Sequence, residues 1–188
     1  LGSAVIYYLA AAGVGEIIIA DSDKPEITNL NRQILHTPDD MNKFKAESAA
    51  QKIKKFNPAV SIRVLNKRID EKEMGDAAGP ADFVIDASDN FISKFMVNDY
   101  CVKNKKAFSH AGALALGGQI MTYTPGSACL RCFFEDAPKN APNSNDEGIL
   151  GVVAGTLGTL QAAEAVKYLS GAGDLLVGRM LFYDALRM

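Results

Sequence analysis

The 188-residue sequence predicts an α/β fold in which a mostly parallel sheet is flanked by helices, with an added mixed or antiparallel portion toward the C-terminal end. Two observations predict this class. Short apolar runs typical of strands alternate along the chain with runs of helical length, as in sheets covered by helices on both faces. Hydrophobic residues make up 48% of the chain, which is enough for a sizeable core. We expect one domain over residues 1–188.

The first elements in chain order are a helix at residues 4–12 and a strand at 17–20, joined by a glycine-containing loop. A helix followed by a short loop and an apolar strand forms the second half of a βαβ unit. We therefore expect a first strand and a glycine-rich phosphate-binding loop to precede residue 1. Gly2 and Ser3 lie where that loop would end, beside a helix N-terminus that favours negative charge. The alternative is that Ser3 only caps the helix.

The remaining chain continues the alternation. We expect helices at residues 43–56, 91–103 and 151–169, and strands at 60–65, 82–87, near 107, at 119–124 and at 179–183. Residues 125–147 are expected to form a loop region, because prolines and asparagines are frequent there. The glycine-rich apolar stretch 151–165 permits close helix packing, either in the core or at a homodimer face.

Composition excludes several classes of function. The chain has 20 Lys+Arg and 22 Asp+Glu, so no strong field attracts it to nucleic acid or to an anionic membrane. The most apolar long stretch, 149–160, is shorter than the roughly 18 residues of a membrane span. The first residues lack the features of a signal peptide. Two of the three cysteines stand in a Cys-x-x-Cys pattern, which suggests a reduced compartment, so we expect a cytoplasmic protein.

Asp21 stands directly at the end of the strand 17–20. A carboxylate in this position of a nucleotide-binding βαβ unit accepts hydrogen bonds from a ribose hydroxyl, which favours a nucleoside without a 2′-phosphate. The alternative is that Asp21 only starts the turn formed by residues 21–25.

Two cations follow on the next segments. Arg32 belongs to the polar cluster 28–33, and Lys45 stands at the start of an amphipathic helix. Together they are suited to neutralising triphosphate oxygens and a pyrophosphate leaving group. The alternative is solvated surface charge, which is a strong possibility for Lys45 because Lys43, Lys54 and other lysines share its helix.

Asp86 stands near the end of the buried strand 82–87, and Ser88, Asp89 and Asn90 follow it, at the carboxyl edge where open α/β sheets bind ligands. Asp89 offers the oxygen ligands that Mg²⁺ prefers. A second, compatible interpretation is that residues 88–90 cap the helix beginning at Phe91.

Taken together, these residues resemble the ThiF/MoeB/HesA family, relatives of ubiquitin-activating enzymes, over essentially the whole chain. The segments that carry the resemblance are Leu1-Gly2-Ser3, Ala20-Asp21-Ser22-Asp23, Asn29-Leu30-Asn31-Arg32-Gln33, Lys45-Ala46-Glu47-Ser48-Ala49, Asp86-Ala87-Ser88-Asp89-Asn90, Cys129-Leu130-Arg131-Cys132, and Gly158-Thr159-Leu160-Gln161-Ala162 with Glu164-Ala165.

The resemblance implies a Rossmann-like domain that uses ATP and Mg²⁺ to adenylate the C-terminal Gly-Gly carboxylate of a small ubiquitin-like sulfur carrier of the thiamine or molybdopterin type. It also implies a homodimer. Arg32, Lys45 and Asp89 are the expected catalytic residues, and Asp89 would face the magnesium-bound end of ATP. The expected ATP-binding residues are Gly2, Asp21, Asp23, Asn29, Arg32, Gln33, Lys45, Asp89 and Asn90.

The resemblance further implies that Cys129 and Cys132 form one half of a structural Cys₄ zinc site, whose second pair would have to follow residue 188. A redox Cys-x-x-Cys is the alternative. Ser144 stands where relatives that transfer sulfur place a cysteine, and a serine cannot form a persulfide. Cys101 is expected to be an inert core residue. We assign no role to His36 or His110.

Three other functions are considered. An NAD-dependent oxidoreductase would also need Asp21, but hydride transfer does not need the set of Arg32, Lys45 and Asp89. An inactive module that only binds a ubiquitin-like partner would not need every ATP-site residue. A family member that adenylates a carboxylate on modified tRNA is possible, although the near-neutral charge favours a sulfur-carrier partner.

Overall fold

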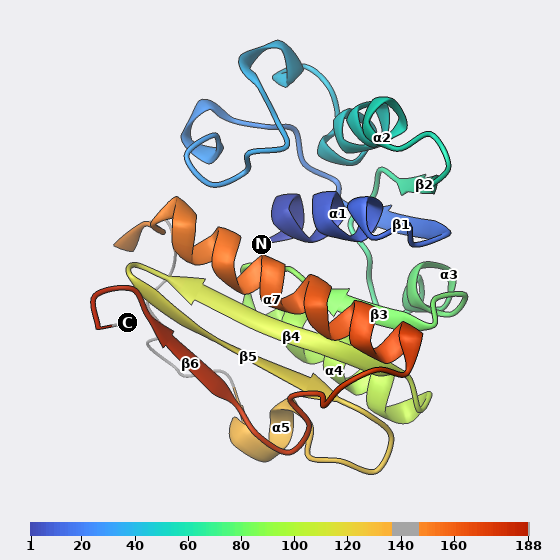
Figure 1. The fold of residues 1–188 in the computed structure, drawn as a ribbon, viewed down its shortest axis with the longest axis vertical. Coiled ribbons are helices and arrows are strands. Elements are labelled where there is room, and N and C mark those ends of the chain that lie inside the picture. Colours follow the sequence, from blue (N-terminus) through green and yellow to red (C-terminus); the bar gives the residue numbers. More distant parts are fainter. Residues whose placement is uncertain (137–146, 188) are drawn as a thin grey trace.

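The computed structural model describes residues 1–136 and 147–187, and all structural statements concern these residues. Figure 1 shows helices on both faces of the larger sheet. In chain order the elements are α1 (Gly2–Ala11), β1 (Glu16–Ala20), the short 3₁₀ helices η1 (Ile27–Asn29) and η2 (Pro38–Asp40), α2 (Lys45–Phe56), β2 (Ser61–Leu65), α3 (Met74–Ala78), β3 (Phe83–Asp86), α4 (Phe91–Lys103), β4 (Ala107–Leu114), β5 (Gly117–Tyr123), α5 (Leu130–Phe133), α7 (Gly151–Ser170) and β6 (Leu181–Asp184).

The strand pairings confirm the predicted fold class. β1 pairs with β2, and β3 pairs with β4, in parallel. From β4 onward the sheet is antiparallel, because β4 pairs with β5 and β5 with β6 in that sense. The parallel part and the antiparallel C-terminal portion that the sequence predicts are therefore both present.

The strands form two separate sheets, β1–β2 and β3–β4–β5–β6. Among the described residues, β1 has no strand partner on the edge away from β2, and β3 has none on the edge away from β4. A cleft lies between these two edges, lined by Ile17, Ile18 and Ile19 on one side and by Val84 and Ile85 on the other.

Helices cover both faces of the larger sheet (Figure 1). On one face, Val153 and Leu157 of α7 pack against Ala111 and Ile120. On the other face, α4 and α5 pack on the sheet through a cluster that contains Phe95, Met121 and Leu130. Ile120 and Met121 are neighbours and face opposite sides, as the alternation of side chains along a strand requires.

α7 has one packed side and one exposed side. A Cβ atom on Gly158 would lie 2.5 Å from the carbonyl oxygen of Leu1, so α1 and α7 approach more closely than a larger residue would permit. On the exposed side, Val152 is 63% exposed, and Gly155 and Leu160 line a shallow hollow near it. The glycine-rich helix is therefore part of the core along one side and leaves an apolar strip along the other.

Two short helices, α3 and α5, lie where the sequence predicts none. Both depend on contacts that no helical periodicity reveals. Asp70 Oδ1 accepts hydrogen bonds from the backbone N–H groups of Lys72 and Glu73 just before α3. The N–H of Leu130, the first residue of α5, donates to Asn98 Oδ1 on α4 at 2.9 Å. No helix among the described residues is long and apolar enough to cross a membrane.

Candidate nucleotide-binding site

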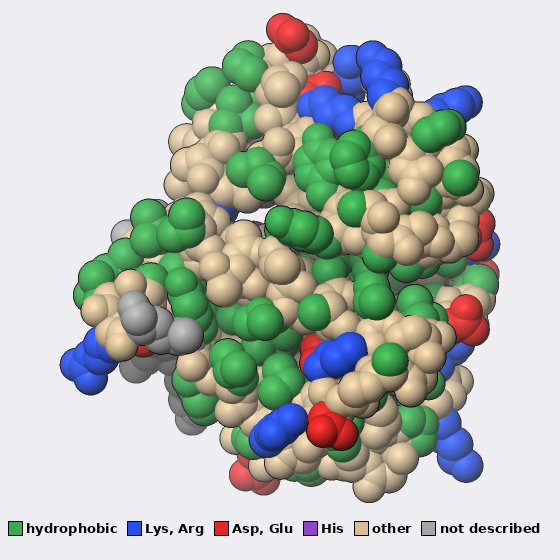
Figure 2. Space-filling view, in the orientation of Figure 1, with side chains coloured by type: hydrophobic (Ala, Val, Ile, Leu, Met, Phe, Trp, Pro, Cys, Tyr) green, Lys and Arg blue, Asp and Glu red, His purple; other side chains and the backbone are tan. Residues whose placement is uncertain are grey.

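A cleft of about 1160 Å³ opens between β1 and β3 and extends to the carboxyl ends of both strands. This volume is large enough for a nucleotide, since small-molecule sites measure roughly 300–1,000 Å³. In Figure 2 the cleft reaches the surface as a gap near the N-terminal end of α1, where Leu1 and Gly2 line it. The predicted ATP-binding residues that line it are Gly2, Asp21, Asp23, Arg32, Gln33, Lys45, Asp89 and Asn90.

Asp21 follows β1, and its backbone N–H donates to the carbonyl of Leu65, the last residue of β2, at 3.2 Å. Its Oδ1 atom accepts a hydrogen bond from the backbone N–H of Asp23 at 2.8 Å. Burial raises the pKa of Asp21, and that hydrogen bond and the charge of Lys45 partly offset the effect. The turn therefore orients the carboxylate, so the turn and the ribose-binding interpretations are compatible.

Lys45 lies in the wall of the cleft, partly buried, with 12% of its side chain exposed. Its ammonium lies 3.2 Å from Asp23 Oδ2, and its backbone N–H donates to the carbonyl of Asp23 at 2.8 Å. Lys54 and Lys55 of the same helix are exposed. Lys45 is thus distinct from the solvated lysines around it.

Arg32 lies in the segment between β1 and α2. Its Nη1 atom donates to the carbonyl of Thr28 and to Asn31 Oδ1, both at 3.0 Å. Asn29 is the predicted ATP-binding residue that does not line the cleft. Its side chain instead accepts from the backbone N–H of Glu26, at the start of η1. The structure therefore brings Arg32, but not Asn29, to the cleft wall.

The segment that carries Arg32 is tied to α2 and α7. His36 Nδ1 lies 3.0 Å from Ser48 Oγ, and Lys52 Nζ donates to the carbonyl of Leu35 at 2.7 Å. Asn31 Nδ2 donates to the carbonyl of Ile149, just before α7, at 3.3 Å. These contacts hold Arg32 on the same side of the cleft as Lys45.

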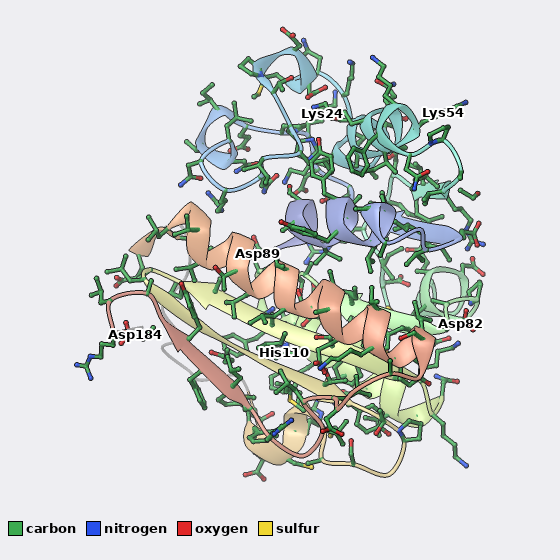
Figure 3. The ribbon with its side chains drawn as sticks, viewed as in Figure 1. Lys24, Lys54, Asp82, Asp89, His110 and Asp184 are labelled. Carbon is green, nitrogen blue, oxygen red and sulfur yellow. The ribbon has the colours of Figure 1, made fainter. Side chains whose placement is uncertain are left out.

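The residues after β3 divide two tasks between them. Asn90 caps α4, because its Oδ1 accepts from the backbone N–H of Ser93 at 2.9 Å. The carboxylate of Asp89 accepts one side-chain hydrogen bond from the described residues, from Asn90 Nδ2 at 3.3 Å, and lines the cleft. In Figure 3 Asp89 projects beside the N-terminal end of α1. The capping role belongs to Asn90, which leaves Asp89 available to a ligand.

Three residues next to this site were not assigned a role from the sequence. Asp86, Lys94 and His110 are all buried, and Asp86 and Lys94 also line the cleft. His110 Nδ1 lies 2.8 Å from Asp86 Oδ2. A lysine between Phe91 and Phe95 on a packed helix is the one sequence signal that points to this cluster.

Cys129 and Cys132 bring their Sγ atoms to 3.9 Å from each other. Two thiolates on one tetrahedral zinc ion lie about 3.8 Å apart, since Zn–S bonds measure about 2.3 Å. In the described part of the chain, no group of three or more His, Cys, Asp or Glu side chains could hold a metal ion. The pair fits half of a four-thiolate site.

Cys101 is fully buried, and burial raises its pKa to about 12, so it is the inert core residue that the sequence predicts. The prediction for Ser144 lies outside the described residues.

The cleft lies at the carboxyl ends of parallel strands, with a carboxylate after β1 and two cations on the next segments. These features define a nucleotide-binding domain of the doubly wound α/β class. More specifically, the chain belongs to the ThiF family, whose model matches residues 1–188.

Relatives and a solved structure agree with this assignment. The chain is 42% identical to the SAMP-activating enzyme E1 of Haloferax volcanii over 190 residues, covering all of this chain and 70% of the relative. It is 38% identical to the sulfur carrier protein ThiS adenylyltransferase of Escherichia coli, covering 93% of this chain and 72% of the relative. The crystal structure of E. coli MccB with ATP matches with a TM-score of 0.80 and 26% identity, covering 93% of this chain and 54% of that one. The chain thus spans about half the length of MccB.

Proposed function

We propose that this chain is the ATP-binding part of an adenylyltransferase, which activates the C-terminal Gly-Gly carboxylate of a small ubiquitin-like sulfur-carrier protein. The observation that carries the proposal is the meeting of Asp21, Arg32, Lys45 and Asp89 in one cleft. Two similar proteins are named as an activating enzyme E1 and as a sulfur-carrier adenylyltransferase, and MccB was crystallised with ATP.

The proposed reaction needs positioning and charge stabilisation rather than a protein nucleophile. A carboxylate oxygen of the partner attacks the α-phosphorus of ATP, the bond to the bridging oxygen breaks, and pyrophosphate leaves with the electron pair. Asp21 binds the ribose, and Gly2 lets the start of α1 approach the phosphates. Lys45 and Arg32 stabilise the negative charge that moves onto pyrophosphate.

Asp89 is suited to Mg²⁺, because no cation among the described residues pairs with its carboxylate, which faces the cleft near the carboxylate of Asp21. Bound Mg²⁺ would neutralise charge on the β- and γ-phosphates.

Cys129 and Cys132 would hold Zn²⁺ together with a second thiolate pair, as a structural site. Zinc analysis of the full-length protein and of Cys129→Ser tests this, and unchanged zinc content in the variant would exclude it.

We also propose that one further strand occupies the cleft between β1 and β3, because both facing edges lack a strand partner among the described residues and are lined by isoleucines and valine. The ATP site then needs only the part of the cleft at the strand ends. Slow amide exchange at Ile18 and Ile85 in the full-length protein would support this, and fast exchange would exclude it.

The strip on α7 that contains Val152, Gly155 and Leu160 is proposed as part of a homodimer interface. We place the protein in the cytoplasm, where ATP is available and free thiols such as Cys129 and Cys132 stay reduced.

The oxidoreductase alternative is not favoured, because family membership and both named relatives indicate carboxylate activation. The tRNA alternative is not favoured, because the relative from Escherichia coli is named for a sulfur carrier protein as its partner.

Pyrophosphate exchange into ATP by the full-length protein, with Mg²⁺ and a Gly-Gly-ending carrier, tests the function. Lys45→Ala should lower the exchange rate by about 100-fold or more, because each donor to a developing negative charge contributes about that much. Arg32→Ala and Asp89→Ala should show losses of the same order.

Lys54→Ala is the matched control, since Lys54 is an exposed lysine of the same helix (Figure 3) and should leave the rate unchanged. No exchange with any Gly-Gly-ending protein, together with tight NAD binding, would overturn the proposal in favour of the oxidoreductase.

A further inference from the structure

We propose that Asp86 and His110 form a buried positioning pair for the nucleotide site, which acts through Lys94 and Ser88 to fix the turn that presents Asp89. The inference rests on the proposed function for its consequence in catalysis. Its structural basis is the set of hydrogen bonds that joins Asp86 to His110 and Ser88, and Lys94 to Ser88.

Asp86 is the last residue of β3, and its side chain is 1% exposed. One carboxylate oxygen, Oδ1, accepts from the backbone N–H of Ser88 at 3.1 Å and from Ser88 Oγ at 2.5 Å. The other oxygen, Oδ2, accepts from His110 Nδ1 at 2.8 Å and lies 3.5 Å from Lys94 Nζ. Burial alone would raise the pKa of Asp86, but Lys94, His110 and Ser88 together lower it. The carboxylate is therefore ionised, with both oxygens engaged.

Lys94 connects this carboxylate to the backbone around the cleft. Its side chain on α4 is 8% exposed, and its ammonium donates to the carbonyl of Ser88 at 2.6 Å and to that of Ala111 at 2.8 Å. With Asp86 Oδ2 nearby, the three protons of the ammonium have three partners. Ser88 is thus held at its N–H and hydroxyl by Asp86 and at its carbonyl by Lys94.

Asp89 follows Ser88 directly, and within the described residues its own carboxylate is held only by Asn90 Nδ2. The direction in which Asp89 points into the cleft is therefore set by the backbone of Ser88. Any rotation of the Asp86 carboxylate would release its two hydrogen bonds to Ser88 and move Lys94 away from the carbonyl of Ser88. Misplacement of a reacting group by about 1 Å can reduce a rate by about 100-fold.

His110 stands on β4 directly opposite Asp86 in the parallel pairing, and it is 2% exposed. Burial lowers the pKa of His110 more than Asp86 raises it, so the ring is neutral and Nδ1 carries the donated proton. Nε2 is then a buried acceptor without a hydrogen-bond partner in the described part of the chain. An unsatisfied buried acceptor is destabilising, and an apolar side chain in this place would avoid that cost. The donation to Asp86 is the interaction that an apolar residue could not supply.

The pair is distinct from the residues proposed to touch ATP. His110 does not line the cleft, and both oxygens of Asp86 are occupied by protein donors. Both are therefore positioning residues, and their loss should change turnover more than ATP affinity.

The test compares His110→Leu and His110→Asn in pyrophosphate exchange by the full-length protein. His110→Leu replaces the imidazole by an apolar side chain that has no donor. It should lower kcat by about 10-fold to 100-fold, with the KM for ATP changed less than about threefold. His110→Asn, whose amide can donate in place of Nδ1, should restore kcat to within about threefold. Equal kcat in wild type and His110→Leu, or an equal loss in both variants, would overturn the proposal.

Cys101→Ala is the matched control for stability, because Cys101 is a fully buried residue of α4 without a role in the site. It should lower the melting temperature and leave kcat unchanged. A loss of kcat in Cys101→Ala like that of His110→Leu would mean that destabilisation alone explains the effect, and would overturn the proposal.

NMR decides the inference independently of turnover. In ¹⁵N-labelled wild type, His110 should show a protonated Nδ1 and an unprotonated Nε2. The amide resonances of Ser88 and Asp89 should shift in His110→Leu and return to their wild-type positions in His110→Asn. A proton on Nε2, or unshifted resonances in His110→Leu, would overturn the inference. Absence of exchange in wild type would instead refute only the proposed function.

Discussion

Single residues show how burial separates functional side chains from ordinary ones of the same type. Lys45 and Lys94 are charged groups at the cleft with little exposed surface, whereas Lys54 is solvated. A buried ammonium persists only with partners, and here Asp23 and Asp86 are those partners. Residue type alone does not distinguish these lysines.

His36 provides a prediction at this scale. Burial, with the charge of Lys52, lowers the pKa of His36 to about 4 from its ordinary 6.5. Between these two values the unfolded state binds a proton that the folded state does not, so the free energy of unfolding falls as pH falls from about 6.5 to about 4. Above about pH 6.5 His36 is neutral in both states, so it no longer makes the free energy of unfolding depend on pH.

Urea denaturation between pH 4.5 and 7.5 checks this. In His36→Asn, the dependence of the unfolding free energy on pH below 6.5 should become less steep, by at most about 1.4 kcal/mol per pH unit. Lys54→Ala should keep the wild-type slope. Identical slopes for His36→Asn and wild type would contradict the assigned pKa.

At the scale of elements, α7 is held to the sheet by a buried carboxylate as well as by apolar packing. Glu164 Oε2 accepts from Thr122 Oγ1 of β5 at 2.5 Å and from the backbone N–H of Leu176 at 2.7 Å. Its other oxygen pairs with Lys167. One side chain thus joins α7, β5 and the segment that leads to β6.

Glu164→Gln should lower the free energy of unfolding by about 1–3 kcal/mol, because it removes the charge from bonds to a buried hydroxyl and a part-buried N–H, and its amide N–H₂ can turn toward these donors. The denaturation midpoint measures this. Asp174→Asn removes the same charge from an exposed position of the same region and should change stability by less than about 0.5 kcal/mol. An equal effect of both substitutions would show that net charge, not the buried bonds, matters.

For the whole molecule, the exposed strip of α7 leads to a prediction about assembly. The face that carries α7 shows many hydrophobic and few charged side chains over the helix (Figure 2). Val152→Glu places a charge in that strip, where a partner subunit would have to bury it. We expect it to shift the full-length protein from dimer to monomer in analytical ultracentrifugation.

Val102→Glu is the control, since Val102 is an exposed valine on α4, on the opposite face of the sheet (Figure 1). It should leave the protein dimeric. A wild-type monomer, or a Val152→Glu dimer of unchanged affinity, would exclude this interface.

Much of the fold follows from the sequence because periodicity reflects burial. The apolar runs of β1 and β3 and the long helix α7 stand where the sequence places them. α5 was not predicted, because its single turn depends on Asn98 and on the pair of Arg131 with Asp99, residues about 30 positions away. The cleft residues were identified from motif spacing, but Lys94 and His110 have no motif of their own.

The sequence by itself determined the fold class and the family, since strand and helix periods and the spacing of Asp21, Arg32, Lys45 and Asp89 are properties of the chain alone. Only the tertiary structure decided which polar side chains meet. Whether Asp86 engages His110 depends on the pairing of β3 with β4, and whether Lys45 is buried depends on the approach of α2 to the turn after β1. Side-chain proximity and desolvation arise when distant segments pack together, so they cannot be read from one segment.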